Sequence, residues 1–530
     1  MQAWGNNVEA NPAQRQMRAL LACIHPLCGA SLTLTALLSG VAATAADPEE
    51  LAVRTAAGRL PAIVRQVMVR SGVPGVAVAV VHRDRLVMAE GFGVRDVVRG
   101  GDVTADTVFQ LASISKSLGA SAVAAAIGKG RLRWDTPVAP LLPGFALADP
   151  WVSQRVTVGD LYSHRSGLPG DIGNDLDALG FDQQTIFERI RLAPLAPFRI
   201  SYAYCNFGLS AGAIAAANAS AMGWQELTRA LLFTPLGMNR STFSEAEFRR
   251  MDNTSVLHQK VTGRWIPGPI RHTEGLAPAG GASSSVNDMA RWLRMMLSDG
   301  RFEGRTVVSA APLKALQTLQ IRTGGDAGNR IEGYGYGIML SIADDAPLAW
   351  SHAGDFPEGG STQFYLFPDL NLGIIVLTNG WPAGVPQAVI AAFDDLVRHG
   401  RTTRDWFQLA SKAVEPLTTP TFSIDGQRQP DSPVAARPLT SYVGVYSNPY
   451  VGDVQVTLEA GHLMVALGPQ GVSRRRLRHW SGDVFFYNQP EYPEGFYTAV
   501  RFTGLHNGTP TTMSLDAIQP GLGTLVRAPR

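Results

Sequence analysis

Strand-like segments occur near residue 80 and again near residue 360, and a long stretch of mostly helical patterning separates them. Residues 75–93 (GVAVAVVHRDRLVMAEGFG) are typical of two antiparallel strands joined by a turn at Arg83 and Asp84. Residues 347–379 contain three short segments rich in β-branched and aromatic residues, separated by Gly, Pro and Asp. This order predicts one α+β domain, over residues 46–400, whose sheet is completed by strands from both of its ends.

Two helices stand out between and before these strands. Residues 51–75 carry apolar side chains at helical spacing, which predicts a helix. Residues 113–127 (SISKSLGASAVAAAI) are small or apolar on all sides, as expected for a helix that is buried in the core.

The pattern changes towards the end of the chain. Residues 401–436 show little periodicity and are predicted to be a linker, with a short helix over 406–414 that Pro416 would end. Residues 437–530 contain alternating strand-like segments with turn signals about every ten residues. They predict a separate all-β domain, either a small barrel or a sandwich.

Residues 1–45 have the order of a secretory signal peptide. No charged side chain occurs among the 28 residues from Ala19 to Ala46, basic residues precede this run, and small residues end it. We expect cleavage near Ala45 and a periplasmic or secreted protein, in which Cys205 is the remaining cysteine. An uncleaved membrane anchor is the alternative, because the uncharged run is long enough to span a bilayer, and Met17 is an alternative start.

Charge and residue content exclude several classes of function. The chain has 46 basic and 44 acidic side chains, whereas a nucleic-acid-binding platform needs a basic excess on one face. The 10 His and 3 Cys residues form neither an H-E-x-x-H motif nor paired C-x-x-C motifs, so no metal site is predicted. We expect no cofactor, and we expect the partner to be a small-molecule or short-peptide substrate.

Ser113 and Lys116 stand three residues apart at the start of the predicted buried helix. Positions three apart share a helix face, and the amides at a helix N-terminus favour a developing negative charge. The apolar neighbours would lower the pKa of Lys116 and suit it to accept a proton from Ser113. The pair predicts a nucleophile with its base, although an N-capping serine with a solvent-facing lysine would show the same spacing.

Two further motifs follow, with Tyr204 and Asn206 in SYAYCNFG and His352 and Gly354 in WSHAGDFPEGG. With these motifs the sequence resembles the serine β-lactamase and penicillin-binding-protein superfamily, which carries S-x-x-K, Y-x-N and a strand with K-T-G or H-x-G. The resemblance covers about residues 55–395 and is greatest to class C β-lactamases, D-aminopeptidases and family VIII-type esterases. It implies an antiparallel sheet flanked by helices, and the final β domain resembles an uncharacterised domain that often follows such hydrolases.

The resemblance implies a role for each motif residue. Ser113 would attack an acyl carbonyl to form an acyl-enzyme, and Lys116 and Tyr204 would form the proton-transfer pair, with either as the base. Asn206 would orient the substrate or the lysine. The backbone amides of Ser113 and Asp355 would hold the oxyanion.

The third motif departs from K-T-G. His352 stands where β-lactamases and DD-peptidases have a lysine that meets a substrate carboxylate, and a neutral imidazole is a poor anchor for that group. The resemblance therefore favours the aminopeptidase and esterase branches. A side chain at Gly354 would be expected to obstruct a substrate paired along the strand. Cys205, in the middle of Y-x-N, is predicted to be a small buried thiol.

Ser210 and His164 also stand in sequence patterns that resemble those of catalytic residues. Ser210 lies in G-L-S-A-G, a nucleophile-elbow pattern, but that elbow follows a strand of a parallel sheet, which the surrounding sequence does not predict. His164 in SHRSG has the chemistry of a base, yet the resemblance assigns it to a structural loop.

We therefore predict an exported serine hydrolase that forms an acyl-enzyme with an ester, an amide, a small D-amino-acid peptide or a lactam. Esterase or aminopeptidase activity is favoured over true β-lactamase activity. One alternative is a catalytically idle, penicillin-binding-like sensor or binding protein, and another is a β-lactamase or DD-carboxypeptidase acting on peptidoglycan.

Overall fold

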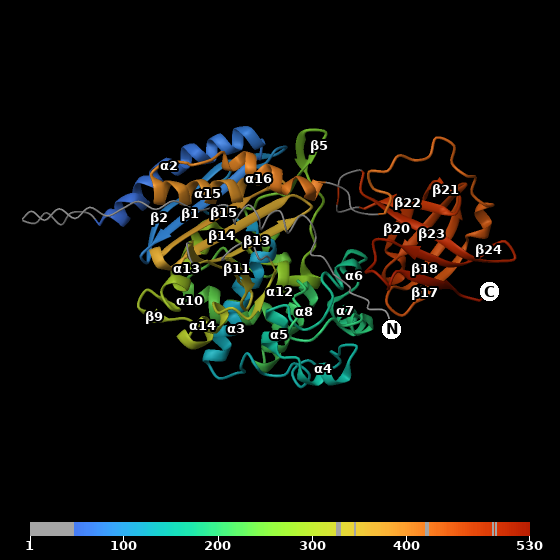
Figure 1. Cartoon of the computed structure of the whole chain (residues 1–530), viewed down its shortest axis with the longest axis horizontal. Coiled ribbons are helices and arrows are strands. Elements are labelled where there is room, and N and C mark those ends of the chain that lie inside the picture. The colour runs from blue at the N-terminus through green and yellow to red at the C-terminus, as the bar shows by residue number, and fades with distance from the viewer. Residues whose placement is uncertain are drawn as a thin grey trace, which may run out of the picture.

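Figure 1 shows the computed structural model, in which an α+β domain is followed by an all-β domain. The structure describes residues 47–324, 330–343, 346–418, 423–489, 492 and 495–529. The predicted signal peptide and the alternative start at Met17 lie outside the described residues. None of the helices within those ranges combines the length and the apolar content that crossing a membrane requires.

The first domain is built on a sheet of nine strands within the described ranges. In sequence order these strands are β1 (Gly75–His82), β2 (Arg85–Asp96), β3 (Gly100–Asp102), β10 (Ile321–Arg322), β11 (Arg330–Tyr334), β12 (Met339–Ala343), β13 (Ala346–Phe356), β14 (Gly360–Phe367) and β15 (Leu372–Thr378). They lie side by side in the order β10-β11-β12-β13-β14-β15-β1-β2-β3. The sheet is completed by strands from both ends of the domain, so this prediction is confirmed.

Strand β1 shows why the sheet lies inside the domain. All of its residues are buried, and alternate side chains belong to two different apolar clusters, one on each face of the sheet. A strand that is buried on both faces reads as a continuous apolar run rather than as an alternation. The turn that follows has positive φ angles at Arg83 and Asp84, as the sequence predicts for a tight hairpin.

Helices cover both faces of the sheet (Figure 1). One face carries α2 (Pro48–Ser71) and α15 (Val385–His399). The other face carries α13 (Val286–Leu297), and beyond it lie α3 (Ser115–Gly128) and α8 (Asn206–Ala219). Helix α2 ends at Ser71, before the end of the predicted segment 51–75, because Gly72 adopts a left-handed conformation.

The segment predicted as a linker contacts both domains. Helix α16 (Trp406–Val414) packs on α15, and the indole of Trp406 donates a hydrogen bond to Asp395 (2.6 Å). Further along, Ile424 packs against Phe486 and Ala499 of the all-β domain.

The second domain is a nearly closed barrel of nine strands among the residues described. Its strands are β17 (Gly444–Asn448), β18 (Gly452–Glu459), β19 (His462–Leu467), β20 (Ser473–Arg476), β21 (Arg478–Ser481), β22 (Val484–Asn488), β23 (Tyr497–His506), β24 (Thr509–Leu515) and β25 (Thr524–Arg527). These strands pair in the order β20-β19-β18-β17-β25-β24-β23-β22-β21. The two strands at the ends of this order, β20 and β21, are separated in the chain by Leu477 alone. The strand ladder therefore almost closes on itself, which decides for a barrel over a sandwich.

Candidate active site

Ser113 lies in a short 3-10 turn, Ala112–Ile114, directly before α3. Lys116, in the first turn of α3, is completely buried. Its Nζ donates hydrogen bonds to Ser113 Oγ (3.0 Å) and to the carbonyl oxygen of Ala279 (2.9 Å). The lysine therefore points back at the serine and does not face solvent.

Burial lowers the pKa of Lys116 to about 7, and the neighbouring acidic groups of Asp171 and Cys205 act in the opposite direction. Burial lowers the pKa values of His164 and His352, and the charge of Lys116 lowers both further. Near neutral pH a large fraction of Lys116 is therefore an uncharged amine that can accept a proton.

Tyr204 contacts the same pair of residues. Its hydroxyl is hydrogen-bonded to Ser113, and Lys116 Nζ lies 4.6 Å from the centre of its ring. Burial raises the pKa of Tyr204 well above that of a free phenol, so the hydroxyl keeps its proton at neutral pH. This arrangement favours Lys116 as the base and leaves Tyr204 able to pass on a proton.

Asn206 is the first residue of α8, and its Nδ2 donates a hydrogen bond to Asn174 Oδ1 (3.1 Å). Asn174 in turn donates to Asp171 Oδ1 (3.0 Å), and the Asp171 amide donates to the Tyr204 carbonyl oxygen (3.0 Å). The loop that holds Asn174 and Asp171 thus supports both residues of the Y-x-N motif. Sequence reasoning missed these two residues because no local motif marks them.

His352 is buried and both of its ring nitrogens are used within the protein. Nδ1 donates to the carbonyl oxygen of Ala353 (2.6 Å), so Nε2 accepts from the hydroxyl of Tyr334 (2.8 Å). Burial lowers the pKa of His352 to about 3, which keeps the imidazole neutral. Tyr334 was not predicted, since it belongs to a different strand and no motif contains it.

Gly354 packs directly against the turn that carries the nucleophile. A Cβ atom at this position would lie 2.2 Å from the Leu111 carbonyl oxygen and 2.8 Å from the Ser113 amide nitrogen. This close approach of two backbones requires glycine here, whether or not a substrate also pairs along the strand. Asp355 follows in β13, so its amide lies within one residue of the contact with Ser113.

The edge of β13 beside this contact is open among the described residues. β13 pairs with β12 as far as Ser351, whereas residues 352–356 pair with β14 alone. Burial also raises the pKa of the Asp355 carboxyl to about 6. An unpaired strand edge of this kind is where an extended peptide can add as a further strand.

Replacing Gly354 by alanine should destabilise the fold. The new methyl group would force β13 away from the Ser113 turn, and overpacking of this kind costs about 1–3 kcal/mol. The matched control is Gly58→Ala in the exposed middle of α2, where nothing lies within 4 Å of the new Cβ. That change should stabilise the protein by about 0.5–1 kcal/mol. Urea unfolding of both variants measures the two effects, and equal shifts would contradict the close approach.

The other candidate residues have structural positions. Ser210 is fully buried in α8, and its hydroxyl has no hydrogen-bond partner in the described parts of the chain. His164 is buried, and its Nδ1 accepts from the Cys205 amide (3.1 Å). Cys205 Sγ accepts from the Gly208 amide (3.2 Å) at the start of α8, and burial raises the thiol pKa to about 12. Cys205 is thus a small, buried, unreactive thiol.

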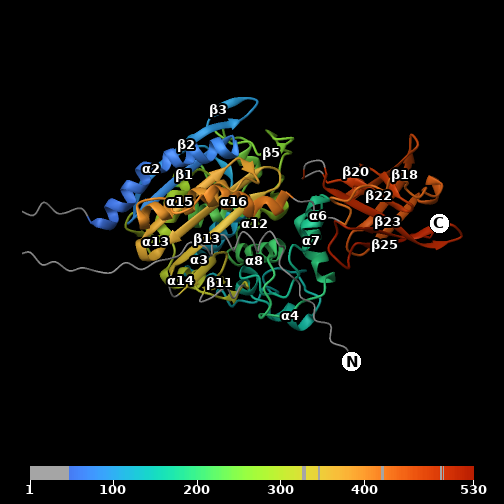
Figure 2. The same cartoon turned by 45° about the horizontal axis from the view of Figure 1, so that its top comes forward.

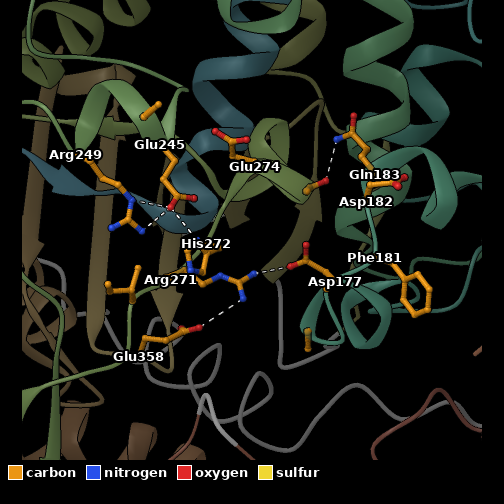
Figure 3. A pocket seen from close by; sticks show the side chains of 15 residues that line it. Asp177, Phe181, Asp182, Gln183, Glu245, Arg249, Arg271, His272, Glu274 and Glu358 are labelled. Atoms are coloured by element: carbon orange, nitrogen blue, oxygen red, sulfur yellow. Dashed lines mark hydrogen bonds and ion pairs between the residues drawn. The ribbon is translucent and has the colours of Figure 1, made fainter. Parts of the chain in front are cut away.

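A pocket of about 690 Å³ lies beyond the end of β13. Figure 3 shows Arg271 between two carboxylates in this pocket. Its guanidinium nitrogens lie 3.0 Å from Asp177 Oδ2 and 3.5 Å from Glu358 Oε1. The guanidinium also lies over Phe356, which packs on Ala112 next to Ser113. The pocket is therefore one layer of side chains away from the nucleophile.

Within the described ranges no cluster of His, Cys, Asp and Glu is arranged to hold a metal ion.

Comparison with known proteins identifies a family for each of the two domains. A family model described as beta-lactamase matches residues 60–398, and one described as a domain of unknown function (DUF3471) matches residues 428–524. Penicillin-binding protein 4 of Amycolatopsis lactamdurans is 32% identical over 318 residues, which are 58% of this chain and 81% of that protein. Esterase EstB of Burkholderia gladioli is 27% identical over 395 residues, which are 67% of this chain and 99% of that protein.

The fold is also similar to that of the octameric penicillin-binding protein homologue from Pyrococcus abyssi. The TM-score is 0.58 at 21% identity, and the match covers 89% of this chain and 99% of that one. The matched family model spans more than half of the chain and includes Ser113, Lys116, Tyr204 and His352. The chain therefore belongs to the beta-lactamase family, the superfamily of serine β-lactamases and penicillin-binding proteins, and carries a DUF3471 barrel after its hydrolase domain.

Proposed function

We propose that the protein is an exported serine hydrolase that cleaves esters or short amides through an acyl-enzyme. The observation that carries this proposal is the pair of contacts at Ser113, whose hydroxyl meets both a buried Lys116 with a pKa of about 7 and the hydroxyl of Tyr204. A weak nucleophile with an adjacent base is what acyl transfer needs.

In the proposed reaction, the neutral Lys116 amine takes the proton from Ser113 as Oγ attacks the substrate carbonyl. The oxygen of the tetrahedral intermediate carries the negative charge and accepts hydrogen bonds from the amides of Ser113 and Asp355. Tyr204 passes the proton to the leaving alcohol or amine as the bond to it breaks. Water then attacks the acyl-enzyme and releases the acid, and the proton it loses is returned to Ser113.

The state of His352 supports esters and short amides over β-lactams. This residue occupies the position of the K-T-G lysine, yet it is neutral and both of its nitrogens are bonded within the protein. It offers no positive charge to the carboxylate that β-lactams and D-Ala-D-Ala peptides carry. The similarity to esterase EstB supports the same preference.

A substrate panel tests this preference. We expect higher kcat/KM for p-nitrophenyl butyrate than for nitrocefin or D-Ala-D-Ala peptides, with D-amino-acid amides as the other favoured class. Faster turnover of nitrocefin would reverse the assignment. If a fluorophosphonate and a fluorescent penicillin both fail to label the wild-type protein, a non-enzymatic sensor is the better description.

Export rests on the sequence of residues 1–45, and we propose a periplasmic or secreted location with a small-molecule or short-peptide substrate as the partner. N-terminal sequencing of the protein from the extracytoplasmic fraction should begin near Ala46. A protein that retains the whole segment in the membrane fraction would instead support an uncleaved anchor.

A further inference from the structure

A tyrosine of the barrel reaches the loop that supports the active site. Tyr450 lies in the turn between β17 and β18 and is almost completely buried. Its hydroxyl donates a hydrogen bond to Asp175 Oδ1 (2.7 Å) and accepts one from the Gly173 amide (3.3 Å). Burial raises the pKa of Tyr450, so the hydroxyl keeps the proton that it donates.

Further hydrogen bonds from both domains hold the turn around Tyr450. The side-chain oxygen of Asn448 accepts from the amides of Tyr450 (3.0 Å) and Val451 (2.6 Å). Arg189 donates to the Tyr450 carbonyl oxygen (2.8 Å), and the Gln519 amide donates to Asp175 Oδ2 (2.9 Å). The backbone of Tyr450 is thus fixed by hydrogen bonds on both sides of its peptide unit.

The contacted residues flank the one that bonds to the active site. Asn174 stands between Gly173 and Asp175 and begins α6 (Asn174–Ala178), and its side chain accepts from Asn206. Both views show α6 and α7 (Gln183–Arg189) between the barrel and the rest of the hydrolase domain (Figures 1 and 2). The segment 171–175 therefore bonds to the Y-x-N segment through Asp171 and Asn174 and to the barrel through Gly173 and Asp175.

We propose that Tyr450 is a positioning residue of the active site. By holding Gly173 and Asp175 it fixes Asn174, and through Asn174 it sets the orientation of Asn206. This inference rests on the proposed function in one respect, namely that Asn206 acts on the substrate. Removing the hydroxyl would leave the Gly173 amide without its partner inside the protein, which favours rearrangement of the loop.

Tyr450→Phe tests the proposal because it removes the hydroxyl and keeps the ring. We expect kcat/KM for p-nitrophenyl butyrate to fall about tenfold after correction for the fraction of protein that a fluorophosphonate labels. The matched control is Tyr446→Phe, which removes an equally buried hydroxyl that bonds to the Tyr442 carbonyl oxygen (3.0 Å) inside the barrel. The control should stay within about twofold of wild type, since its hydroxyl does not contact α6.

A double-mutant cycle tests the route through Asn174. Asn174→Ala should lower kcat/KM by a similar factor, and Tyr450→Phe combined with it should cause little further loss, because both changes break one chain of contacts. Multiplied losses in the double variant, or an unchanged kcat/KM in Tyr450→Phe, would overturn the positioning role.

Hydrogen exchange provides a measurement that does not depend on activity. In Tyr450→Phe the backbone amides of residues 171–176 should exchange faster than in wild type, whereas in Tyr446→Phe they should not. Unchanged exchange in Tyr450→Phe would contradict the proposal even if no substrate is known. If the wild type hydrolyses nothing and yet the exchange changes as expected, the proposed function fails while the contact between the barrel and the loop stands.

Discussion

Ser113→Ala should abolish both covalent labelling by a fluorophosphonate and ester hydrolysis. The change removes the atom that attacks the substrate, and loss of the nucleophile from such a unit costs as much as loss of the whole unit. We expect kcat for p-nitrophenyl butyrate to fall by at least about 10⁴-fold. The fold should be retained, because the Ser113 hydroxyl bonds only to Lys116 and Tyr204 in the described structure.

Ser210→Ala is the matched control for this variant. Ser210 is a serine of the same chain with a nucleophile-like sequence context, but it is buried in α8 without a hydrogen-bond partner among the described residues. Its replacement should leave labelling intact. A label that persists in Ser113→Ala and disappears in Ser210→Ala would show that the nucleophile is misassigned.

Lys116→Met should have the second largest effect on activity. The wild-type kcat/KM should rise with pH and level off above an apparent pKa of about 7, because the amine must be neutral to accept a proton. The methionine variant keeps the volume and loses the base, so kcat should fall about 10³-fold and the rise near neutral pH should disappear. A variant that retains this rise would assign it to a different group.

The same variant has an expected effect on stability with a defined sign. The pKa of Lys116 is about 7 in the folded protein and 10.5 for a solvated lysine, so between these values the unfolded chain binds the extra proton. The free energy of unfolding of the wild type therefore falls as the pH drops from 10.5 to about 7. Methionine does not titrate, so the variant does not lose this part of its stability. The difference in melting temperature, Lys116→Met minus wild type, should therefore be more positive at pH 7 than at pH 10. An equal difference at both pH values would show that burial does not shift the lysine.

The sequence predicts those features that depend on near neighbours in the chain. The hairpin at Arg83 and Asp84 follows from a polar turn between two apolar runs, and the helix at 406–414 is bounded by Pro416. The burial of Lys116 follows from its small, apolar neighbours. In each case the physical cause lies within a few residues.

Other features depend on contacts that no local pattern records. The hydrogen bond from Tyr334 to His352 requires that β11 and β12 lie beside β13, and the bond from Tyr450 to Asp175 joins two domains. The close packing of Gly354 against the backbone of the Ser113 turn also went unpredicted, because it depends on where β13 meets that turn. These interactions are set by the packing of distant segments, and a single sequence does not encode them in a readable form.

The place of β1 in the sheet determines when the hydrolase domain can fold during biosynthesis. β1 is made early, yet one of its edges pairs with β15, so that Val76 lies opposite Thr378, about 300 residues later. The edge of β1 that pairs with β15 stays unpaired until that distant strand has been synthesised, because long-range strand pairing waits for loop closure. Until β15 has been made, β1 presents an unpaired strand edge, which is the kind of surface at which chains aggregate.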